Sequence, residues 1–318
     1  GVAGSGKTML ARAQAERFAL KDMSTLVLCY NKNLAEWLER EVAEEFTDKI
    51  TAIHFHKLCS TWCRKAGIAF APRDDVDFWR LEAPELLFDA ISLLDDRFDA
   101  VVVDEGQDFF PEWWEPIQLL LADAKDSPMY VFYDQAQNLF QAQNLVLPPL
   151  GEPFHLPTNC RNTREIAKTC SQILAHPIDT HESAPDGIQT EWIYHAAPDS
   201  VLSTLTSMTK TWIRKERITP RQIAILSPYK LRNSSLAQAT HLAGVPITED
   251  LDTWRDDEGI LYSTIRSFKG LEADIVAIVD VGRPAEDSIF KTADFYVGCS
   301  RAKHLLKIFT SSSADEWA

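Results

Sequence analysis

The first eight residues of the chain constrain its fold more than any other stretch. They read Gly1-Val-Ala-Gly-Ser-Gly-Lys-Thr8 and match the pattern G-x-x-x-x-G-K-[ST] at every fixed position. Glycines without a Cβ atom let the backbone curl so that successive N–H groups surround phosphate oxygens. A helix expected from Lys7 to Ala19 directs the positive end of its dipole at the same anion. The sequence therefore predicts a site for the phosphates of a nucleoside triphosphate.

Each part of this loop has a chemical role. We expect the Lys7 ammonium to reach the β- and γ-phosphates and the Thr8 hydroxyl to ligate Mg²⁺, so ATP and Mg²⁺ are the predicted cofactors. Further nucleotide contacts are expected from the rest of the loop, namely Gly1, Gly4, Ser5 and Gly6. Such a loop normally follows a buried strand. We therefore expect the chain to begin inside a domain, with the first strand and any upstream domain outside this sequence.

Composition limits the classes of protein that fit. The 318 residues suffice for two domains, and 45% hydrophobic with 25% charged residues is typical of a globular protein. No apolar run approaches the ~20 residues of a membrane span, so no membrane partner is expected. Six irregularly spaced cysteines indicate reduced thiols in the cytoplasm. A net charge of −15 argues against non-specific coating of nucleic acid, although it permits a local basic groove.

Short apolar runs alternate with helical patterns along the whole chain. In the first half, strands are expected at 25–30, 50–53, 100–105 and 129–133. Helices are expected at 7–19, 55–66 and 83–94, and a further helix is expected to begin after Asn31, which would cap it. A stretch rich in Pro and Gly at 148–157 is predicted to be a linker. Beyond it, helices are expected near 162–175, 199–215 and 232–243, and strands near 188–193, 222–226, 260–265, 274–279 and 304–310. This alternation predicts an α/β fold with two domains in series, 1–150 and 151–318, each with a parallel sheet.

Two adjacent carboxylates follow the most apolar strand. The segment Asp104-Glu105-Gly-Gln-Asp108 comes directly after the run Ala100-Val-Val-Val103. In enzymes with a phosphate loop, the first carboxylate at such a strand end holds Mg²⁺ and the second polarises the attacking water. An exposed acidic turn has the same composition. The apolar strand before it and the phosphate loop in the same domain favour the catalytic interpretation.

These motifs together resemble superfamily 1 helicases of the UvrD/Rep type. The D-E-G-Q-D segment is similar to the family's Walker B element, and six further motifs before and after it occur in the family's order, so that the matches span residues 1–303. They are similar to motif Ia (28–35), the T-F-H-S-L-C stretch (54–59), motif III (134–140), motif IV (159–162), motif V (264–272) and motif VI (296–302). The resemblance implies two RecA-like P-loop NTPase domains with ATP in the cleft between them. Because 60–100 and 165–260 are short, accessory subdomains are expected to be reduced.

The resemblance also implies roles for single residues. Gln137 matches the glutamine that senses the γ-phosphate, Arg161 and Arg301 match two arginines that contact it, and Gly270 and Glu272 match nucleotide-binding positions. Phosphoryl transfer requires cations around the γ-phosphate oxygens, which agrees with this set. The predicted catalytic residues are Lys7, Asp104, Glu105, Gln137, Arg161 and Arg301, with Mg²⁺ on Thr8 and Asp104.

Residues in the family's strand-facing motifs are predicted to contact nucleic acid. They are Asn31, Lys32, Phe55, His56 and Ser267. Single-stranded DNA is the expected partner, with RNA as an alternative. A core position for Phe55 is an equal alternative. The sequence departs from the family at Cys160, where the relatives have a tyrosine that stacks on the nucleotide base, and at 141–142, where an aromatic residue is expected.

A cluster of His54, His56, Cys59 and Cys63 offers four zinc-type ligands. Its spacing resembles no common structural zinc site, and ligands on a helix beginning at 55 converge poorly, so we assign no zinc there.

The leading prediction is an ATP hydrolase that translocates on single-stranded DNA, 3′→5′ by family analogy. One alternative is a nucleic-acid-activated ATPase switch that does not unwind and regulates an attached nuclease or protein partner. Another is a P-loop protein that controls a protein partner without nucleic acid. A small-molecule kinase has the least support, because nothing resembles a lid over a phosphate acceptor.

Overall fold

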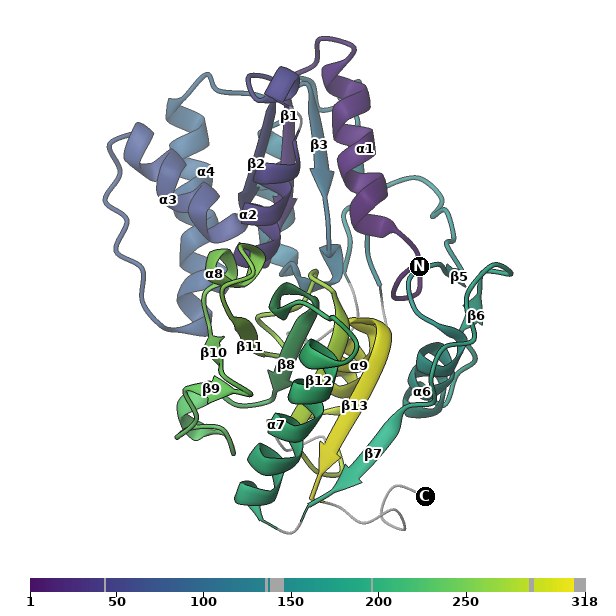
Figure 1. The fold of residues 1–318 in the computed structure, drawn as a ribbon. Coiled ribbons are helices and arrows are strands. Elements are labelled where there is room, and N and C mark those ends of the chain that lie inside the picture. Colours follow the sequence, from purple (N-terminus) through teal and green to yellow (C-terminus); the bar gives the residue numbers. More distant parts are fainter. Residues whose placement is uncertain (43, 135–136, 138–145, 196, 286–288, 312–318) are drawn as a thin grey trace. The chain divides into compact units, whose positions relative to one another are not determined.

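A computed structural model describes residues 1–318 except 43, 135–136, 138–145, 196, 286–288 and 312–318. Contacts within the chain divide it into two compact units (Figure 1). The first unit contains Gly1 and Gly6–Leu156, and the second contains Val2–Ser5 and Pro157–Ala318. The division near Leu156 and Pro157 falls in the stretch rich in Pro and Gly. The phosphate-loop segment Val2–Ser5 thus makes its contacts with residues far from it in sequence.

The first unit is built on a four-stranded sheet in which all strands are parallel. Its order is β2-β1-β3-β4, formed by β1 (Thr25–Cys29), β2 (Ile50–His54), β3 (Ala100–Val103) and β4 (Met129–Val131). Every residue of β1 and β3 is buried, which explains why both read as continuous apolar runs. The carboxyl ends of β3 and β4 lie side by side, so residues after these strands meet at one edge.

Helices cover both faces of this sheet. The helices α1 (Lys7–Ala19) and α2 (Lys32–Glu41) pack on the face that Val27 and Val102 present. The opposite face, with Leu28 and Val103, packs against α3 (Phe55–Lys65), α4 (Ala83–Leu93) and α5 (Trp114–Leu119). Successive strand residues point to opposite faces, so each strand serves two separate cores. Short helical turns complete the unit: η1 (Glu44–Phe46), the π-helical η2 (Phe78–Glu82), η3 (Gly106–Asp108) and η4 (Pro111–Trp113).

The second unit contains a seven-stranded mixed sheet of order β7-β13-β12-β8-β11-β10-β9. Its strands are β7 (Glu191–Tyr194), β8 (Ile223–Ser227), β9 (His241–Leu242), β10 (Val245–Thr248), β11 (Ile260–Thr264), β12 (Ala273–Val281) and β13 (Ala302–Thr310). The pair β9–β10 is antiparallel and the other pairs are parallel. A separate parallel pair joins β5 (Thr158–Asn159) and β6 (Asp179–Thr180). The predicted α/β class with parallel sheets is confirmed, with the difference that this larger sheet is mixed.

Helices also pack on the larger sheet. The long helix α7 (Pro198–Arg214) buries Val201, Leu205 and Trp212 in a core with β8 and β12. The helices α6 (Arg164–Leu174) and α9 (Thr292–Ser300) pack on each other and contact β13. A short helix, α8 (Leu251–Arg255), precedes β11. Among the residues that the structure describes, no helix has both the length and the apolar character needed to cross a lipid bilayer.

The predicted helix at 232–243 is wrong. The segment forms a 3₁₀ turn, η7 (Leu231–Asn233), followed by turns and β9. The Asp280 carboxylate accepts a hydrogen bond from the backbone N–H of Ser235 at 3.0 Å, and this contact replaces a helical hydrogen bond. Ala243 and Gly244 have positive φ angles of 51° and 91° and turn the chain into β10. Serine side chains and a strand hairpin therefore outweigh the helical spacing of the apolar residues.

Candidate active site

The phosphate loop keeps a backbone conformation that requires glycine. Gly4 and Gly6 have φ angles of 70° and 82°, and Gly6 is the residue before the first turn of α1. A Cβ atom on Gly4 would lie 2.9 Å from the Arg161 Cβ atom. Within the described part of the chain, the N–H groups of Gly4 and Gly6 have no acceptor and the buried Ser5 hydroxyl has no hydrogen-bond partner. Unsatisfied donors at a helix N-terminus fit an anion.

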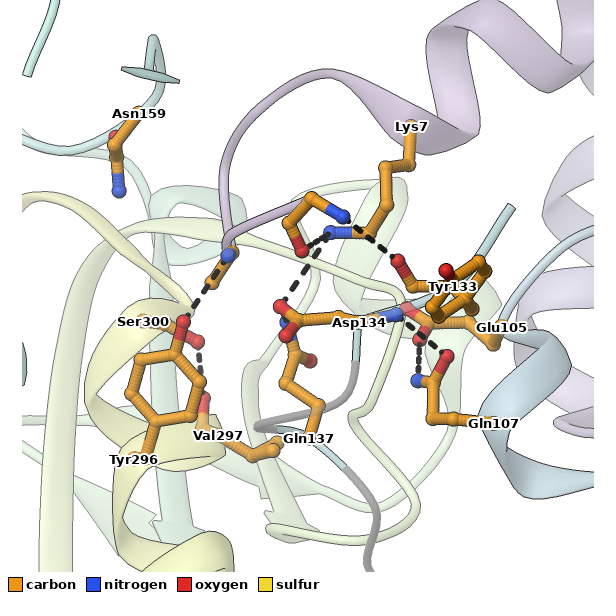
Figure 2. A network of polar contacts seen from close by, with 12 residues as sticks. Lys7, Glu105, Gln107, Tyr133, Asp134, Gln137, Asn159, Tyr296, Val297 and Ser300 are labelled. Carbon is orange, nitrogen blue, oxygen red and sulfur yellow. Dashed lines mark hydrogen bonds and ion pairs between the residues drawn. The ribbon is translucent and has the colours of Figure 1, made fainter. Parts of the chain in front are cut away.

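Lys7 holds a buried positive charge at the start of α1. Its ammonium forms an ion pair with Asp134 Oδ2 at 3.4 Å and donates to the Gly1 carbonyl oxygen at 3.2 Å (Figure 2). Only 7% of the Lys7 surface and 2% of the Asp134 surface are exposed. A buried ammonium needs a partner charge, and Asp134 supplies it.

A chain of hydrogen bonds joins the residues that follow β3 and β4. Gln107 accepts the backbone N–H of Asp134 at 2.8 Å through Oε1 and donates to the Glu105 carboxylate through Nε2 (Figure 2). The side chain of Gln137 donates to Asp134 Oδ2 at 2.7 Å. Glu105 itself has a φ of 55°, an unusual value for a residue with a Cβ atom. Three of the six predicted catalytic residues, Lys7, Glu105 and Gln137, thus belong to one network around Asp134.

Asp104 is fully buried beside Thr8. Burial, and then the neighbouring charge of Glu105, raise the pKa of Asp104 to about 6, while hydrogen bonds from the Thr8 hydroxyl and the Glu105 N–H oppose the rise. Its Oδ2 atom is buried with no hydrogen-bond partner in the described residues. Mg²⁺ is commonly held by one or two protein oxygens together with substrate phosphates and water. The free carboxylate oxygen and the adjacent hydroxyl therefore fit this cation.

The zinc-type side chains of the sequence have other partners. His54 caps α3, with Nδ1 accepting the Lys57 N–H at 3.3 Å. Cys59 and Cys63 are buried in the core of the first unit. No group of three or more His, Cys, Asp or Glu residues suited to a metal occurs in the ranges that the structure describes.

The predicted nucleic-acid contacts of the first unit differ in exposure. Asn31 caps α2 by accepting the N–H groups of Asn33 and Leu34, which confirms the predicted cap. Lys32 is exposed, with its ammonium 3.5 Å from Glu36 Oε1. Phe55 is fully buried and stacks on Trp113 with ring centroids 3.7 Å apart. Phe55 therefore follows the core alternative, because no face of its ring is open to a base.

His56 is surrounded by aromatic rings. Its ring centroid is 4.0 Å from that of Trp79 and 5.5 Å from that of Tyr30. Burial, and then the nearby His54, lower the pKa of His56 to about 4. His56 is consequently neutral at pH 7 and contributes no positive charge toward a phosphate backbone.

In the second unit, Arg161 is held by a carboxylate and an amide. Its Nε atom is 2.6 Å from Glu272 Oε2, and the side chain of Asn159 accepts the Arg161 backbone N–H at 3.0 Å. The Nη1 atom of Arg161 is buried with no hydrogen-bond partner among the described residues. Gly270 has a φ of 86°, which a side chain would disfavour. Arg161 and Glu272, predicted on separate motifs, are thus direct neighbours.

Arg301 has a structural role in this state of the protein. It is 2% exposed, and its guanidinium donates to the carbonyl oxygens of Val297 at 3.1 Å and Leu271 at 3.5 Å. The first contact lies in the last turns of α9, and the second joins Arg301 to the segment just before β12. Ser267 is exposed, and its hydroxyl accepts a hydrogen bond from the Thr264 hydroxyl at 2.8 Å.

Sequence reasoning did not place several residues in the site. The sequence places Asp134 only at the start of motif III and Gln107 only in the acidic segment, although both organise the network. Two contacts of the phosphate-loop segment Val2–Ser5 within the second unit were also not predicted. The Tyr296 hydroxyl accepts the Ala3 N–H at 3.0 Å (Figure 2), and the Cys160 N–H donates to the Gly4 carbonyl oxygen at 2.9 Å. Within the predicted motif III (134–140), residues 135–136 and 138–140 lie outside the described residues, as do the following positions 141–142.

Comparison with models of known protein families and with curated proteins finds no match to this chain.

Proposed function

We propose that this chain is an ATP-dependent motor of the superfamily 1 type that hydrolyses ATP while translocating along single-stranded DNA. One observation carries the proposal: the phosphate-loop residues Lys7 and Thr8 meet the strand-end carboxylates Asp134 and Asp104 in one buried site. A phosphate loop with acidic residues at adjacent parallel strand ends suits binding and hydrolysis of a nucleoside triphosphate. The order of the later motifs in the sequence supports the motor class.

The proposed chemistry assigns one task to each group. Hydrolysis adds water to the γ-phosphorus and breaks the bond to ADP, so the site must bind the phosphates and remove a proton from that water. Lys7 would exchange Asp134 for the phosphate oxygens, and Glu105, held by Gln107, would accept the proton. Thr8 and Asp104 would hold Mg²⁺, which when bound neutralises charge that develops on the phosphate oxygens.

The proposed role of the two arginines is unequal. Arg161 has one unpartnered guanidinium nitrogen within the described part of the chain, so it can take a phosphate oxygen without losing an existing bond there. Arg301 must first give up its contacts with the carbonyl oxygens of Val297 and Leu271. We therefore rank Arg161 ahead of Arg301 as the residue that contacts the γ-phosphate.

A second function, an ATPase switch that binds nucleic acid without unwinding it, has one observation in its favour. The described residues form two compact units. The segment between α3 and β3 adds only η2 and α4 among these residues. Few of the described residues are thus left to form the accessory subdomains that the resemblance to the family implies. The small number of residues left for accessory subdomains supports translocation or switching better than strand separation.

The test compares ATPase rates with and without single-stranded DNA. We expect DNA to stimulate hydrolysis, Lys7→Ala to lower the rate by about 100-fold or more, and the exposed Lys21→Ala control to leave it unchanged. Circular dichroism of each variant checks folding. A strand-displacement assay then separates motor from switch. Equal rates without nucleic acid, with DNA and with RNA would contradict both and favour control of a protein partner.

A further inference from the structure

A hollow of about 430 Å³ lies on the first unit, lined by residues that none of the motifs contain. Its walls come from η2 and α4 on one side and from η4 and α5 on the other. We call it the α4–α5 groove. Its volume is within the range of sites that bind part of a ligand or a partner segment. None of its lining residues belongs to the candidate active site, so it is a separate feature of the molecule.

One wall of the α4–α5 groove is apolar and incompletely covered. The core-facing residues of α4, such as Leu87 and Ile91, are at most 1% exposed. On the groove side, Leu81, Pro84 and Phe88 recur at helical spacing, and Pro116 of α5 faces them across the hollow. Leu81 remains 45% exposed and Phe88 39% exposed. Pro84 between them is buried, so η2 and α4 present two apolar side chains, Leu81 and Phe88, that the described chain covers only in part.

The rest of the lining is acidic. It contains Glu85, Asp89, Glu112 and Glu115 and no Lys, Arg or His. Arg80 pairs with one oxygen of Glu112 at 2.8 Å, while the other oxygen is buried with no hydrogen-bond partner in the described residues. The other three carboxylates form no ion pair with any residue that the structure describes. The fold thus leaves most of this negative charge for an incoming group to neutralise.

We propose that the α4–α5 groove docks a basic amphipathic helix of a partner protein. Apolar side chains of that helix would cover Leu81 and Phe88, and flanking Lys or Arg residues would pair with Glu85, Asp89 and Glu115. Leu81 and Phe88 are seven residues apart, about 10 Å along a helix, which matches the spacing of apolar anchors on an amphipathic partner helix. Charge complementarity selects this occupant, because four carboxylates repel a nucleic-acid backbone. A second copy of the chain, with a net charge of −15, is also disfavoured.

The probe is a fluorescein-labelled helical peptide of about four turns with Leu on one face and Lys or Arg beside it. Its control has the same apolar positions with Glu in place of every Lys and Arg. Fluorescence anisotropy with the full chain, without nucleotide or nucleic acid, measures binding of each. We expect saturable binding of the basic peptide that weakens with added NaCl, and no binding of the acidic one. Equal binding of both peptides, or no saturable binding of the basic one, would overturn the proposal.

Protein variants locate the binding surface. Glu85→Lys combined with Glu115→Lys should weaken the basic peptide about tenfold, because two attractions become repulsions. Phe88→Ala should also weaken it, whereas Asp126→Lys, which changes an exposed carboxylate outside the groove, should not. Circular dichroism confirms that each variant is folded. Unchanged binding in the groove variants would refute the site. A change in the sedimentation of the chain alone would make the occupant a second copy and refute the partner helix.

Discussion

The buried charges of Lys7 and Asp134 should be strongly coupled, so that the contribution of each to the free energy of unfolding depends on the presence of the other. At a separation of 3.4 Å and an effective dielectric constant of about 20, Coulomb attraction between the two charges is about 5 kcal/mol. Each charge keeps another contact when its partner is neutralised, Lys7 with the Gly1 carbonyl and Asp134 with Gln137. Allowing for these contacts, we expect a coupling free energy of about 3 kcal/mol. The stability costs of the two single substitutions should together exceed the cost of the double substitution by this amount, because each single substitution leaves one buried charge without its partner.

A double-mutant cycle with Lys7→Met and Asp134→Asn measures this coupling. Urea unfolding of the four proteins, followed by tryptophan fluorescence, gives the free energy of unfolding of each. The surface pair Lys49 and Asp22, 2.8 Å apart, serves as the control cycle and should show much weaker coupling because solvent screens it. A coupling between Lys7 and Asp134 below about 0.5 kcal/mol would refute the argument, since it would mean that the two charges are not buried together.

Two further predictions concern pH. The pKa of Asp104 is about 6 in the folded protein, above its ordinary value of 3.8, so its contribution to stability is greatest below pH 3.8 and is lost as the pH rises through 6. Asp104→Asn should therefore gain stability over the parent by up to about 3 kcal/mol between pH 4 and pH 8 in urea titrations, and a difference independent of pH would contradict this. The pKa of His56 is lowered from 6.5 to about 4, so its contribution is present above pH 6.5 and is lost as the pH falls through 4. His56→Phe should reduce the acid destabilisation by about 2 kcal/mol in thermal melts, and an unchanged acid limb would show that His56 is not responsible.

Much of the fold followed from the sequence because the signals were local. β1 and β3 were predicted from apolar runs, and burial on both faces of a parallel sheet explains why these runs do not alternate. The phosphate loop and the acidic segment were predicted to act together because both fall in the first domain and the acidic segment follows an apolar strand. In the structure, Thr8 lies beside Asp104 of the acidic segment, and Lys7 pairs with Asp134, which follows the neighbouring strand β4.

The remaining features depend on contacts that sequence spacing does not encode. Asp280 binds the Ser235 backbone from 45 positions away and thereby excludes the expected helix at 232–243. Phe55 sits in a motif that suggests ligand contact, yet the ring of Trp113 covers it. The motif around Arg301 predicts a catalytic arginine, but the carbonyl oxygens of Val297 and Leu271 accept hydrogen bonds from its guanidinium. In each case a distant partner decides the role of the side chain.

The network around Asp134 also suggests how this site would respond to a nucleotide under the proposed function. Asp134 uses its carboxylate to hold Lys7 and its backbone N–H to hold Gln107, and Gln107 in turn holds Glu105. A phosphate that takes Lys7 leaves the Asp134 carboxylate in contact with the Gln137 side chain, which donates to Asp134 Oδ2 at 2.7 Å. Movement of Asp134 would then pull on Gln107 and reposition Glu105. Because Glu105 already occupies an unusual backbone conformation, a small displacement can change where its carboxylate points. The base that activates water would thus be aligned by the arrival of the phosphate that the water attacks.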